Sequence, residues 1–596
     1  MKHLNISLMA VAVAAALAGC NGNDGGSASD TTTTTTTPAA RSISFGSVPV
    51  PATEAEKRAV SATSKATVNG KDYNIGYNTI MRSGDQVGGG TFGLVYDSTG
   101  TPLTATDGSL RVSDDNDFAS LLPVGGKLFM VSHFETRPAA MYLTELSQDK
   151  TSGKLTAVQT RNLDFSAVHG GWVHCAGSVT PWNTHLGSEE YPPDARAVNP
   201  ATGSIDNDSE YYNAMAAYYG GNKLALNAYD YGYQVEVKVN SFDSATVTKH
   251  YTMGRIAHEL GKVMPDNKTV YMSDDGGNGV MLRFVADKAG DLSSGELFAA
   301  KWTQTSKDNG GAANLSWVSL GKATDAEVKT YLDSKLTFAD MFDAETANAD
   351  GSCPTAGFTH VATGSGTTGI NGVTECLKLK TGMEKAASRL ETRRYAALKG
   401  ATTEFNKMEG ITLDQDSKTM YMSMSSVEKS MLDNDKTDLG GPNDIRLDKN
   451  SCGTVFGLKL DDNYAATSMA GVVPGKASTT GDAANTCDLN GVANPDNVTY
   501  MPGYKTLIIG EDTGTGHQND AIWSYNTESK ALTRILTTPY GSETTSPYFY
   551  PDINGWAYLM AVVQHPYGES DQSKLVAGSG DNRAYTGYIG PLPSMK

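Results

Sequence analysis

Short apolar runs of strand length alternate with turns rich in Gly, Asn and Asp from about residue 42 to the end of the chain. Several runs share a local shape, in which an aspartate-containing turn and a Lys-Thr step precede a buried strand, as at residues 264–274 and 413–423. Such recurrence is typical of β-propeller blades, which are small antiparallel sheets around a central channel. Strands are expected at residues 127–133, 224–229, 269–273, 420–424, 506–510 and 557–563.

The pattern therefore predicts an all-β fold over residues 42–596, a β-propeller with about six blades. A decorated β-sandwich is the alternative, and it ranks lower because the repeats run through most of the chain. Residues 324–342 and 383–398 differ, since they place apolar residues at near-helical spacing among Ala, Glu, Lys and Arg. Both segments fall within residues 306–399, and we expect this region to be a partly helical insertion.

The first residues have the pattern of a bacterial export signal. A short basic start precedes an apolar run at residues 6–17, which is too short to span a bilayer comfortably. Leu-Ala-Gly-Cys then resembles a lipobox, so residues 1–20 are expected to be a lipoprotein signal peptide with Cys20 as the lipidated residue. An ordinary signal peptide is the alternative. Residues 21–41 are of low complexity and predict a flexible tether. We expect an exported lipoprotein on the outer membrane, on another membrane facing the periplasm or at the cell surface, attached by its lipid alone.

The charge balance excludes one class of partner. The 596 residues include 48 Lys and Arg against 66 Asp and Glu, which gives a formal net charge of −18. The phosphate backbone of a nucleic acid would be repelled, so no nucleic-acid partner is expected. The same charge suits a protein that gathers divalent cations, although solubility alone also accounts for it. We expect the protein to be a monomer.

The cysteine count leaves one thiol without a partner. Six cysteines occur, and without the lipobox cysteine five remain, an odd number for an oxidising compartment. Nearness in sequence favours the disulfides Cys353–Cys376 and Cys452–Cys487, although four cysteines allow three pairings. Cys175 is then unpaired, and an exported thiol needs burial or a metal ion to protect it.

Residues 174–190 combine Cys175, a turn rich in Gly, Pro and Trp, and the paired carboxylates of Glu189 and Glu190. Thiolate is a soft metal ligand and carboxylates are hard ones, so the segment suits an iron-like ion beside calcium-like ions. A buried structural cysteine before a solvated acidic loop is the alternative. Further acids recur beside the later strands, and strand ends of a propeller converge on its channel, where clustered carboxylates need cations. These acids are Glu259, Asp274, Asp275, Glu409, Asp496, Glu511, Asp512 and Glu543.

A series of short motifs resembles the PhoX-type alkaline phosphatase family, in the family's order and over roughly residues 73–567. The most specific piece is the Cys-Ala-Gly…Thr-Pro-Trp…Glu-Glu stretch that begins at Cys175. The other pieces are Asn-Asp-Phe at 116–118, Tyr-Gly-Tyr-Gln-Val-Glu at 231–236, Gly-Arg…His-Glu at 254–259, Tyr-Met-Ser-Asp-Asp at 271–275, Met-Glu-Gly at 408–410, Pro-Asp-Asn at 495–497 and Gln-His-Pro at 564–566.

The resemblance implies a β-propeller hydrolase that releases phosphate from small phosphomonoesters outside the cytoplasm. It also implies a cofactor of Fe3+ and several Ca2+ ions at the mouth of the channel. Cys175 would bind the iron and Glu259 would hold iron and calcium together, so these two residues would carry the catalytic metals. The other metal ligands that the resemblance implies are Asn116, Glu189, Glu190, Asp274, Asp275, Glu409 and Asp496.

The chain departs from the family pattern at two places. Lys407 stands where an arginine is expected before Glu409, so a substrate phosphate would meet a positive charge without the guanidinium fork. The export signal lacks the paired arginines that the family often carries, so metal would be acquired after export. Both departures leave a second hypothesis open, in which the protein is a non-catalytic, metal-stabilised propeller that serves as a binding or surface-assembly module.

Overall fold

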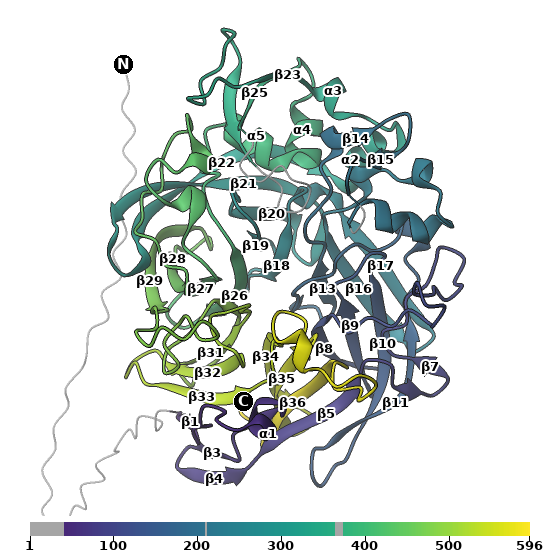
Figure 1. Ribbon diagram of the computed structural model, residues 1–596, viewed down its shortest axis with the longest axis vertical. Coiled ribbons are helices and arrows are strands. Elements are labelled where there is room, and N and C mark those ends of the chain that lie inside the picture. The colour runs from purple at the N-terminus through teal and green to yellow at the C-terminus, as the bar shows by residue number, and fades with distance from the viewer. Residues whose placement is uncertain (1–40, 209–210, 364–373) are drawn as a thin grey trace, which may run out of the picture. The chain divides into compact units, whose positions relative to one another are not determined.

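The computed structural model describes residues 41–208, 211–363 and 374–596. The predicted signal peptide, its Cys20 and almost all of the predicted tether lie outside the described residues. Within residues 41–596, antiparallel sheets lie around a common centre (Figure 1). The strands are short, and tight turns join most of them, as the alternation of apolar runs and turn residues predicts.

Four sheets of four or five strands make up much of the fold. The first contains β8 (Asn116–Val124), β9 (Lys127–Phe134), β10 (Ala140–Gln148) and β11 (Leu155–Asn162). The second contains β12 (Ser178–Val179), β13 (His185–Ser188), β16 (Gln234–Ser241) and β17 (Ser244–His250). The third contains β30 (Pro495–Met501), β31 (Thr506–Glu511), β32 (Ala521–Asn526), β33 (Leu532–Thr537) and β2 (Ser61–Ala62). The fourth contains β34 (Glu543–Ile553), β35 (Trp556–Gln564), β36 (Tyr585–Pro593) and β5 (Gly76–Arg82).

A nine-stranded sheet joins two further groups of strands through the pairing of β22 with β29. One group is β18 (His258–Val263), β19 (Thr269–Asp274), β20 (Leu282–Lys288), β21 (Asp291–Ser306) and β22 (Ala312–Thr324). The other is β26 (Met408–Asp414), β27 (Thr419–Met424), β28 (Thr454–Leu460) and β29 (Ala466–Pro474). This all-β arrangement is the predicted propeller type of fold, and the number of six blades stays a prediction.

Smaller elements decorate the sheets. The short strands are β1 (Ile43–Phe45), β3 (Lys65–Val68), β4 (Lys71–Asn74), β6 (Gln86–Val87), β7 (Gly90–Thr91), β14 (Val198–Asn199), β15 (Ser204–Ile205), β23 (Phe342–Thr346), β24 (Thr359–Ala362) and β25 (Thr374–Leu379). The α-helices are α1 (Glu54–Lys57), α2 (Asp325–Asp333), α3 (Phe338–Met341), α4 (Glu384–Leu390) and α5 (Thr392–Leu398). The 3-10 helices are η1 (Ser166–Val168), η2 (Ala195–Ala197), η3 (Asn213–Tyr219), η4 (Lys223–Ala225), η5 (Ala228–Asp230), η6 (Tyr251–Met253), η7 (Asp308–Gly310), η8 (Lys429–Met431), η9 (Lys436–Asp438) and η10 (Gln572–Lys574).

The first strands of the sheets pack side by side near the centre, where β18 contacts β26, β26 contacts β30, β30 contacts β34 and β34 contacts β8 (Figure 1). The second strands β19, β27 and β31 are buried at every residue. Their apolar runs therefore lie between neighbouring sheets, where burial of apolar surface stabilises the fold. The early strand β5 pairs with β36 near the end of the chain, so distant parts of the sequence complete one sheet.

Most of the expected strands are present, but the prediction of a strand at residues 224–229 is wrong. The helices η4 and η5 occupy that segment. The side chains of Asn222 and Asn227 accept hydrogen bonds from the backbone N–H groups of Leu224 and Tyr229. Such local capping competes with strand pairing, and a single apolar run does not reveal it.

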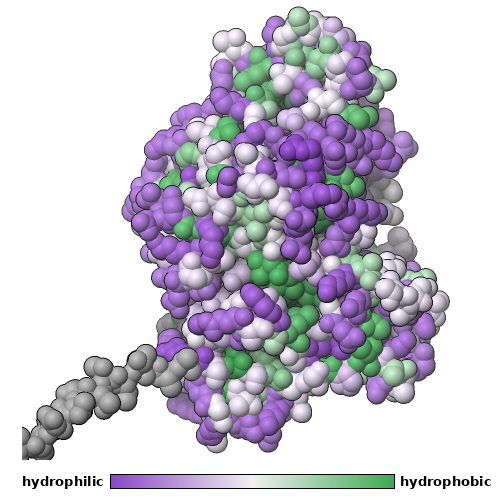
Figure 2. All heavy atoms as spheres, turned by 90° about the vertical axis from the view of Figure 1, so that its left-hand side faces the viewer, coloured by the Kyte–Doolittle hydropathy of each residue, from purple (hydrophilic) through white to green (hydrophobic). Residues whose placement is uncertain are grey.

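The helices α2 to α5 lie in the two segments that have helical spacing, and β23, β24 and β25 form a small sheet between them. Residues 312–324 fall inside the region predicted as an insertion, but they form β22 and so belong to the nine-stranded sheet. None of the helices in the described part of the chain has the length and apolar character needed to span a bilayer. On the face shown in Figure 2, hydrophilic side chains cover most of the surface and hydrophobic ones form local areas.

Candidate metal centre

Four of the strands that pack side by side near the centre of the fold begin with a β-bulge. Each bulge turns one acidic side chain toward that centre. The register shifts lie between Asn116 and Ala119 in β8, His258 and Gly261 in β18, Met408 and Ile411 in β26, and Pro495 and Val498 in β30. A bulge leaves extra residues unpaired and redirects their side chains. In each case the residue after the first ladder position is an acid, namely Asp117, Glu259, Glu409 and Asp496.

The fifth of these strands, β34, has a bulge between Thr545 and Tyr548, and Ser546 occupies the corresponding position. The Ser546 hydroxyl lies 3.0 Å from Oδ1 of Asn497 and donates a further hydrogen bond to Asp117. The bulge in β34 thus places the Ser546 hydroxyl where it orients the carboxylate of Asp117 in the neighbouring strand β8.

Cys175 reaches the same place from the loop before β12. Its Sγ lies 2.9 Å from Oε2 of Glu259 and 3.5 Å from Oδ2 of Asp117. Gly177 lets this loop pass close to its neighbours, because a Cβ there would lie 2.6 Å from the ring of Phe118 and 2.8 Å from the carbonyl oxygen of Leu186. The thiol is buried with 8% of its residue surface exposed, so the fold itself shields it from solvent.

The other cysteines in the described part of the chain form two disulfides, Cys353–Cys376 and Cys452–Cys487. These are the two pairings that nearness in sequence favours. Cys175 is the free cysteine among the described residues.

Three overlapping groups of side chains bring potential metal-ligand atoms within 4.8 Å of one another. Because the first two groups share Cys175 and the last two share Glu259, they form one continuous centre. The groups are Asp117, Glu135 and Cys175; Cys175, Glu190 and Glu259; and Glu259, Glu409 and Asp496.

Mutual repulsion holds this centre in an unfavourable electrostatic state. Burial and the neighbouring Glu409 and Asp117 raise the pKa of Glu259 well above its usual range. Burial and Asp275 likewise raise the pKa of Glu409 to about 8. Burial and Glu259 raise the pKa of Asp496 well above the ordinary value. Carboxylates packed so closely cannot all ionise without cations between them, so this donor set fits metal ions.

Two acids predicted as metal ligands are instead paired with basic side chains. Oε1 of Glu189 lies 2.8 Å from Nζ of Lys249, and both side chains are fully buried. Arg393 donates hydrogen bonds to Asp274 from two guanidinium nitrogens, and its Nε lies 2.6 Å from Oδ2 of Asp274. Buried ion pairs of this kind fix local structure. The structure therefore places Glu189 and Asp274 beside the centre, outside the three ligand groups.

Asn116 and Asp275 lie at the edge of the centre. The Asn116 amide donates to Thr586 at 2.6 Å, while its Oδ1 is a buried acceptor without a hydrogen-bond partner among the described residues. Asp275 accepts hydrogen bonds from Lys407 at 2.9 Å and from the Tyr191 hydroxyl. Burial alone would raise the pKa of Asp275, but the charge of Lys407 lowers it to about 2.

Lys407 is held between two acids. Its Nζ lies 2.9 Å from Oδ2 of Asp275 and 3.2 Å from Oε1 of Glu409, and 28% of the side chain is exposed. Burial alone would lower the pKa of Lys407, but these two carboxylates raise it well above the usual value. Its charge therefore first serves to orient the two acids.

Asp117 and Glu135 are members of the centre that sequence reasoning missed. Asp117 directly follows Asn116, so the Asn-Asp-Phe motif contained the signal and the acid was the better ligand. Glu135 directly follows the buried strand β9, a position beside a strand end like that of the other acids. Burial raises the pKa of Asp117 to about 6 and that of Glu135 to about 7.

A cavity of about 510 Å³ reaches the centre at Glu135. The residues around it include Asp115, Gln564 and His565. Gln564 donates to Oε2 of Glu135 at 2.9 Å, and Nε2 of His565 lies 3.3 Å from Oε2 of Glu543.

Comparison with known proteins shows the family and the fold. The family model described as alkaline phosphatase PhoX matches residues 141–567, which include Cys175, Glu190, Glu259, Glu409 and Asp496. The solved structure of Pseudomonas fluorescens PhoX in complex with vanadate, a transition-state analogue, is similar with a TM-score of 0.56 and 16% identity. The match covers 92% of this chain and 98% of that one, and it supports the same propeller fold.

Other solved structures are much less similar. One is a putative 6-phosphogluconolactonase from Bacteroides uniformis, with a TM-score of 0.28, 12% identity and coverage of 84% of this chain and 98% of that one. Another is a gluconolactonase from Xanthomonas campestris, with a TM-score of 0.27, 8% identity and coverage of 80% and 96%. In sequence, no curated protein matches the chain.

Proposed function

The chain belongs to the alkaline phosphatase PhoX family and is a metal-dependent phosphatase, and from this premise we propose its substrates, its ions and its place in the cell. The substrates are small phosphomonoesters, which fit the cavity of about 510 Å³ beside the acidic centre. The observation that carries the proposal is the continuous run of buried donors from Cys175 through Glu259 to Glu409 and Asp496.

The chemistry of the donors assigns the ions. Cys175 would bind a metal as a thiolate beside Glu259 and Glu190, and such a mixed soft and hard set suits iron. Glu259, Glu409 and Asp496 offer oxygen donors alone, which suit calcium. The unpartnered Oδ1 of Asn116 adds a neutral oxygen at the edge of the centre. We propose Fe3+ at the group formed by Cys175, Glu190 and Glu259, and several Ca2+ ions among the remaining carboxylates of the centre.

When bound, the cations would neutralise the phosphate charge and stabilise the oxygens of an in-line displacement. The chain's own residues hold the geometry. Lys407 orients Asp275 and Glu409 through its two ion pairs. Ser425 donates to Oε1 of Glu409 at 2.6 Å, and Asn497 donates to Oε1 of Glu259 at 3.0 Å. These hydrogen bonds fix the rotamers of both acids before any ion arrives.

We also propose that the protein is exported and anchored by a lipid at Cys20. The lipobox pattern supports this location. The two disulfides support it as well, because such bonds persist in oxidising compartments.

Elemental analysis of the purified full-length protein, combined with release of phosphate from p-nitrophenyl phosphate, tests the proposal. We expect bound iron and calcium, hydrolysis that stops when a chelator removes calcium, and recovery when calcium is returned. Hydrolysis that is indifferent to thorough chelation would contradict the metal mechanism. A protein that carries both metals and releases no phosphate would contradict the phosphatase function.

A further inference from the structure

Arg137 lies in the loop between β9 and β10, which is anchored to the segment that leads to Cys175. The N–H of Val173 donates to the carbonyl oxygen of Thr136 at 3.2 Å, and the N–H of Ala139 donates to that of Gly171 at 3.0 Å. These two bonds bracket Arg137. The arginine is therefore placed by the same backbone segment that places the iron-side thiol.

Two aromatic rings hold the guanidinium of Arg137. Its central carbon lies 4.1 Å from the ring centre of Tyr211 and 5.6 Å from that of Trp172. Trp172 is itself fixed, because its indole N–H donates to the carbonyl oxygen of Glu190 at 2.8 Å. Stacking orients a guanidinium plane without using its N–H donors.

Those donors are unused within the described part of the chain. Nε of Arg137 is buried and has no hydrogen-bond partner there, and the guanidinium forms no ion pair with a described residue. A buried unpaired donor is unfavourable, and a charged one more so. An anionic ligand at the cavity would supply the missing partner.

Arg137 also borders the cavity that reaches the metal centre, together with Glu135, Gln564 and His565. Lys407, the cation expected from the sequence to meet the phosphate, is already paired with Asp275 and Glu409. Lys407 is thus occupied by the centre's own acids, whereas Arg137, which borders the cavity, is stacked, oriented and without an ion pair among the described residues.

We propose that Arg137 is a substrate-binding residue whose guanidinium fork binds the phosphate group of the ester at this cavity. The inference rests on the proposed phosphatase function and deepens it. A planar fork matches two phosphate oxygens at once, which a lysine cannot do. Arg137 would then supply the bidentate recognition that is missing at position 407.

The test compares metal-loaded wild-type protein with Arg137→Met, which keeps the length of the side chain, and Arg137→Lys, which keeps the charge. Arg283→Met is the matched control, because the Arg283 guanidinium also stacks on two rings, at 4.8 Å from Phe298 and 4.9 Å from Trp317, but lies outside the cavity. Binding of orthophosphate is measured by calorimetry and hydrolysis of p-nitrophenyl phosphate by its kcat and KM. Metal content and thermal unfolding are measured for every protein.

We expect Arg137→Met to weaken orthophosphate binding and to lower kcat/KM by about 10- to 100-fold, at unchanged metal content. Arg137→Lys should recover part of the binding, and Arg283→Met should match the wild type. Orthophosphate binding by Arg137→Met or Arg137→Lys that equals the wild type would overturn the inference alone. If the wild type itself neither binds orthophosphate nor hydrolyses the ester, the proposed function falls, and the inference falls with it.

Discussion

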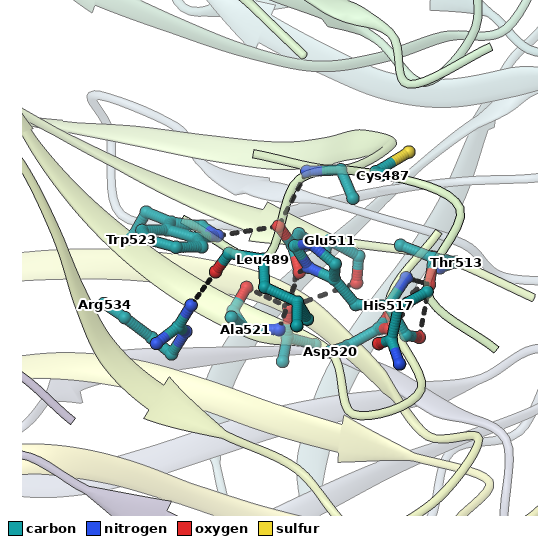
Figure 3. Close-up of polar contacts among 12 residues, drawn as sticks. Cys487, Leu489, Glu511, Thr513, His517, Asp520, Ala521, Trp523 and Arg534 are labelled. Atoms are coloured by element: carbon teal, nitrogen blue, oxygen red, sulfur yellow. Dashed lines mark hydrogen bonds and ion pairs between the residues drawn. The ribbon is translucent and has the colours of Figure 1, made fainter. Parts of the chain in front are cut away.

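Two groups of buried acids in this protein have opposite surroundings. Glu511 accepts four hydrogen bonds, from the N–H groups of Ala493 and Ala521 at 2.8 Å each, from Trp523 at 2.6 Å and from His517 at 2.9 Å. Figure 3 shows its carboxylate at the middle of this network, between Trp523 and His517. Glu259, by contrast, meets the thiol of Cys175 and faces other acids.

The difference separates structural acids from metal-binding ones. Each oxygen of Glu511 has two donors, so its charge is satisfied by the protein alone. Ligand oxygens of Glu259, Glu409 and Asp496 lie within 4.8 Å of one another, and burial together with mutual repulsion raises the pKa values of these acids. Burial alone therefore does not distinguish a candidate metal ligand. The distinguishing features are too few hydrogen-bond donors and too many acidic neighbours around a buried acid.

The largest expected effect is on activity and comes from Glu259→Gln. Two of the three ligand groups share this carboxylate, so its loss should lower kcat/KM by more than about 100-fold. Hydrolysis of p-nitrophenyl phosphate and metal content measure the effect. Glu511→Gln is the matched substitution in the other group of acids, and at a temperature where it is folded it should keep the wild-type kcat/KM. Equal losses in both variants would remove the distinction between the two groups.

The order of the two variants should reverse for stability, so that Glu511→Gln is the destabilising one. In metal-free protein, Glu511→Gln should lower the free energy of unfolding by about 3 kcal/mol, because His517 loses its charged partner and one donor is left facing another. Glu259→Gln should raise that free energy in metal-free protein, since the folded state no longer has to keep this buried acid protonated or ionise it against its acidic neighbours. Urea unfolding in the presence of a chelator measures both. A destabilised Glu259→Gln would show that its carboxylate is already satisfied by the protein.

The metal-free protein should lose stability as the pH rises. Burial and Asp275 raise the pKa of Glu409 to about 8, from 4.5 in the unfolded chain. Between these two values the folded state holds a proton that the unfolded state has released, so stability falls with rising pH, by at most about 1.4 kcal/mol per pH unit for this group. Thermal unfolding of chelated protein at several pH values measures the trend. Added calcium should abolish it, and a calcium-independent slope would contradict the account.

The smallest effect is expected at His517. Burial alone would lower its pKa, but the carboxylate of Glu511 and the carbonyl oxygen of Asp488 raise it. Its stabilising charge is therefore fully present below the unfolded pKa of about 6.5 and is lost as the pH rises through the folded value. His517→Gln should cost about 1 to 2 kcal/mol at low pH and less at high pH. A loss that is the same at both pH values would point to packing instead of charge.

The sequence predicted what local pattern controls. Turn and strand alternation indicated the all-β fold, and strand-end acids indicated the positions of Glu259, Glu409 and Asp496. It also left Cys175 as the unpaired thiol. The motif resemblance then placed these residues in one family's order, and the family match over residues 141–567 confirmed that recognition.

Partners that are distant in the chain could not be predicted in this way. Lys249 pairs with Glu189 across 60 positions, and Arg393 pairs with Asp274 across 119, so neither neighbour is visible beside the acid it satisfies. The bulges could not be predicted from the sequence either. In β8, the irregular register after Asn116 turns Asp117 toward the centre. Pairing and bulging, which three-dimensional structure decides, separate the acids of the three groups from Glu189 and Asp274, which lie beside them.

Anomalous X-ray diffraction from crystals of the metal-loaded protein, recorded on both sides of the iron absorption edge, tests the central claim most directly. We predict an iron peak bonded to Sγ of Cys175 and to a carboxylate oxygen of Glu259. Weaker peaks without an iron edge, from calcium, should lie among Glu259, Glu409 and Asp496, with none at Glu511. Crystals without metal peaks among these acids, or with a cation bound at Glu511, would contradict the account.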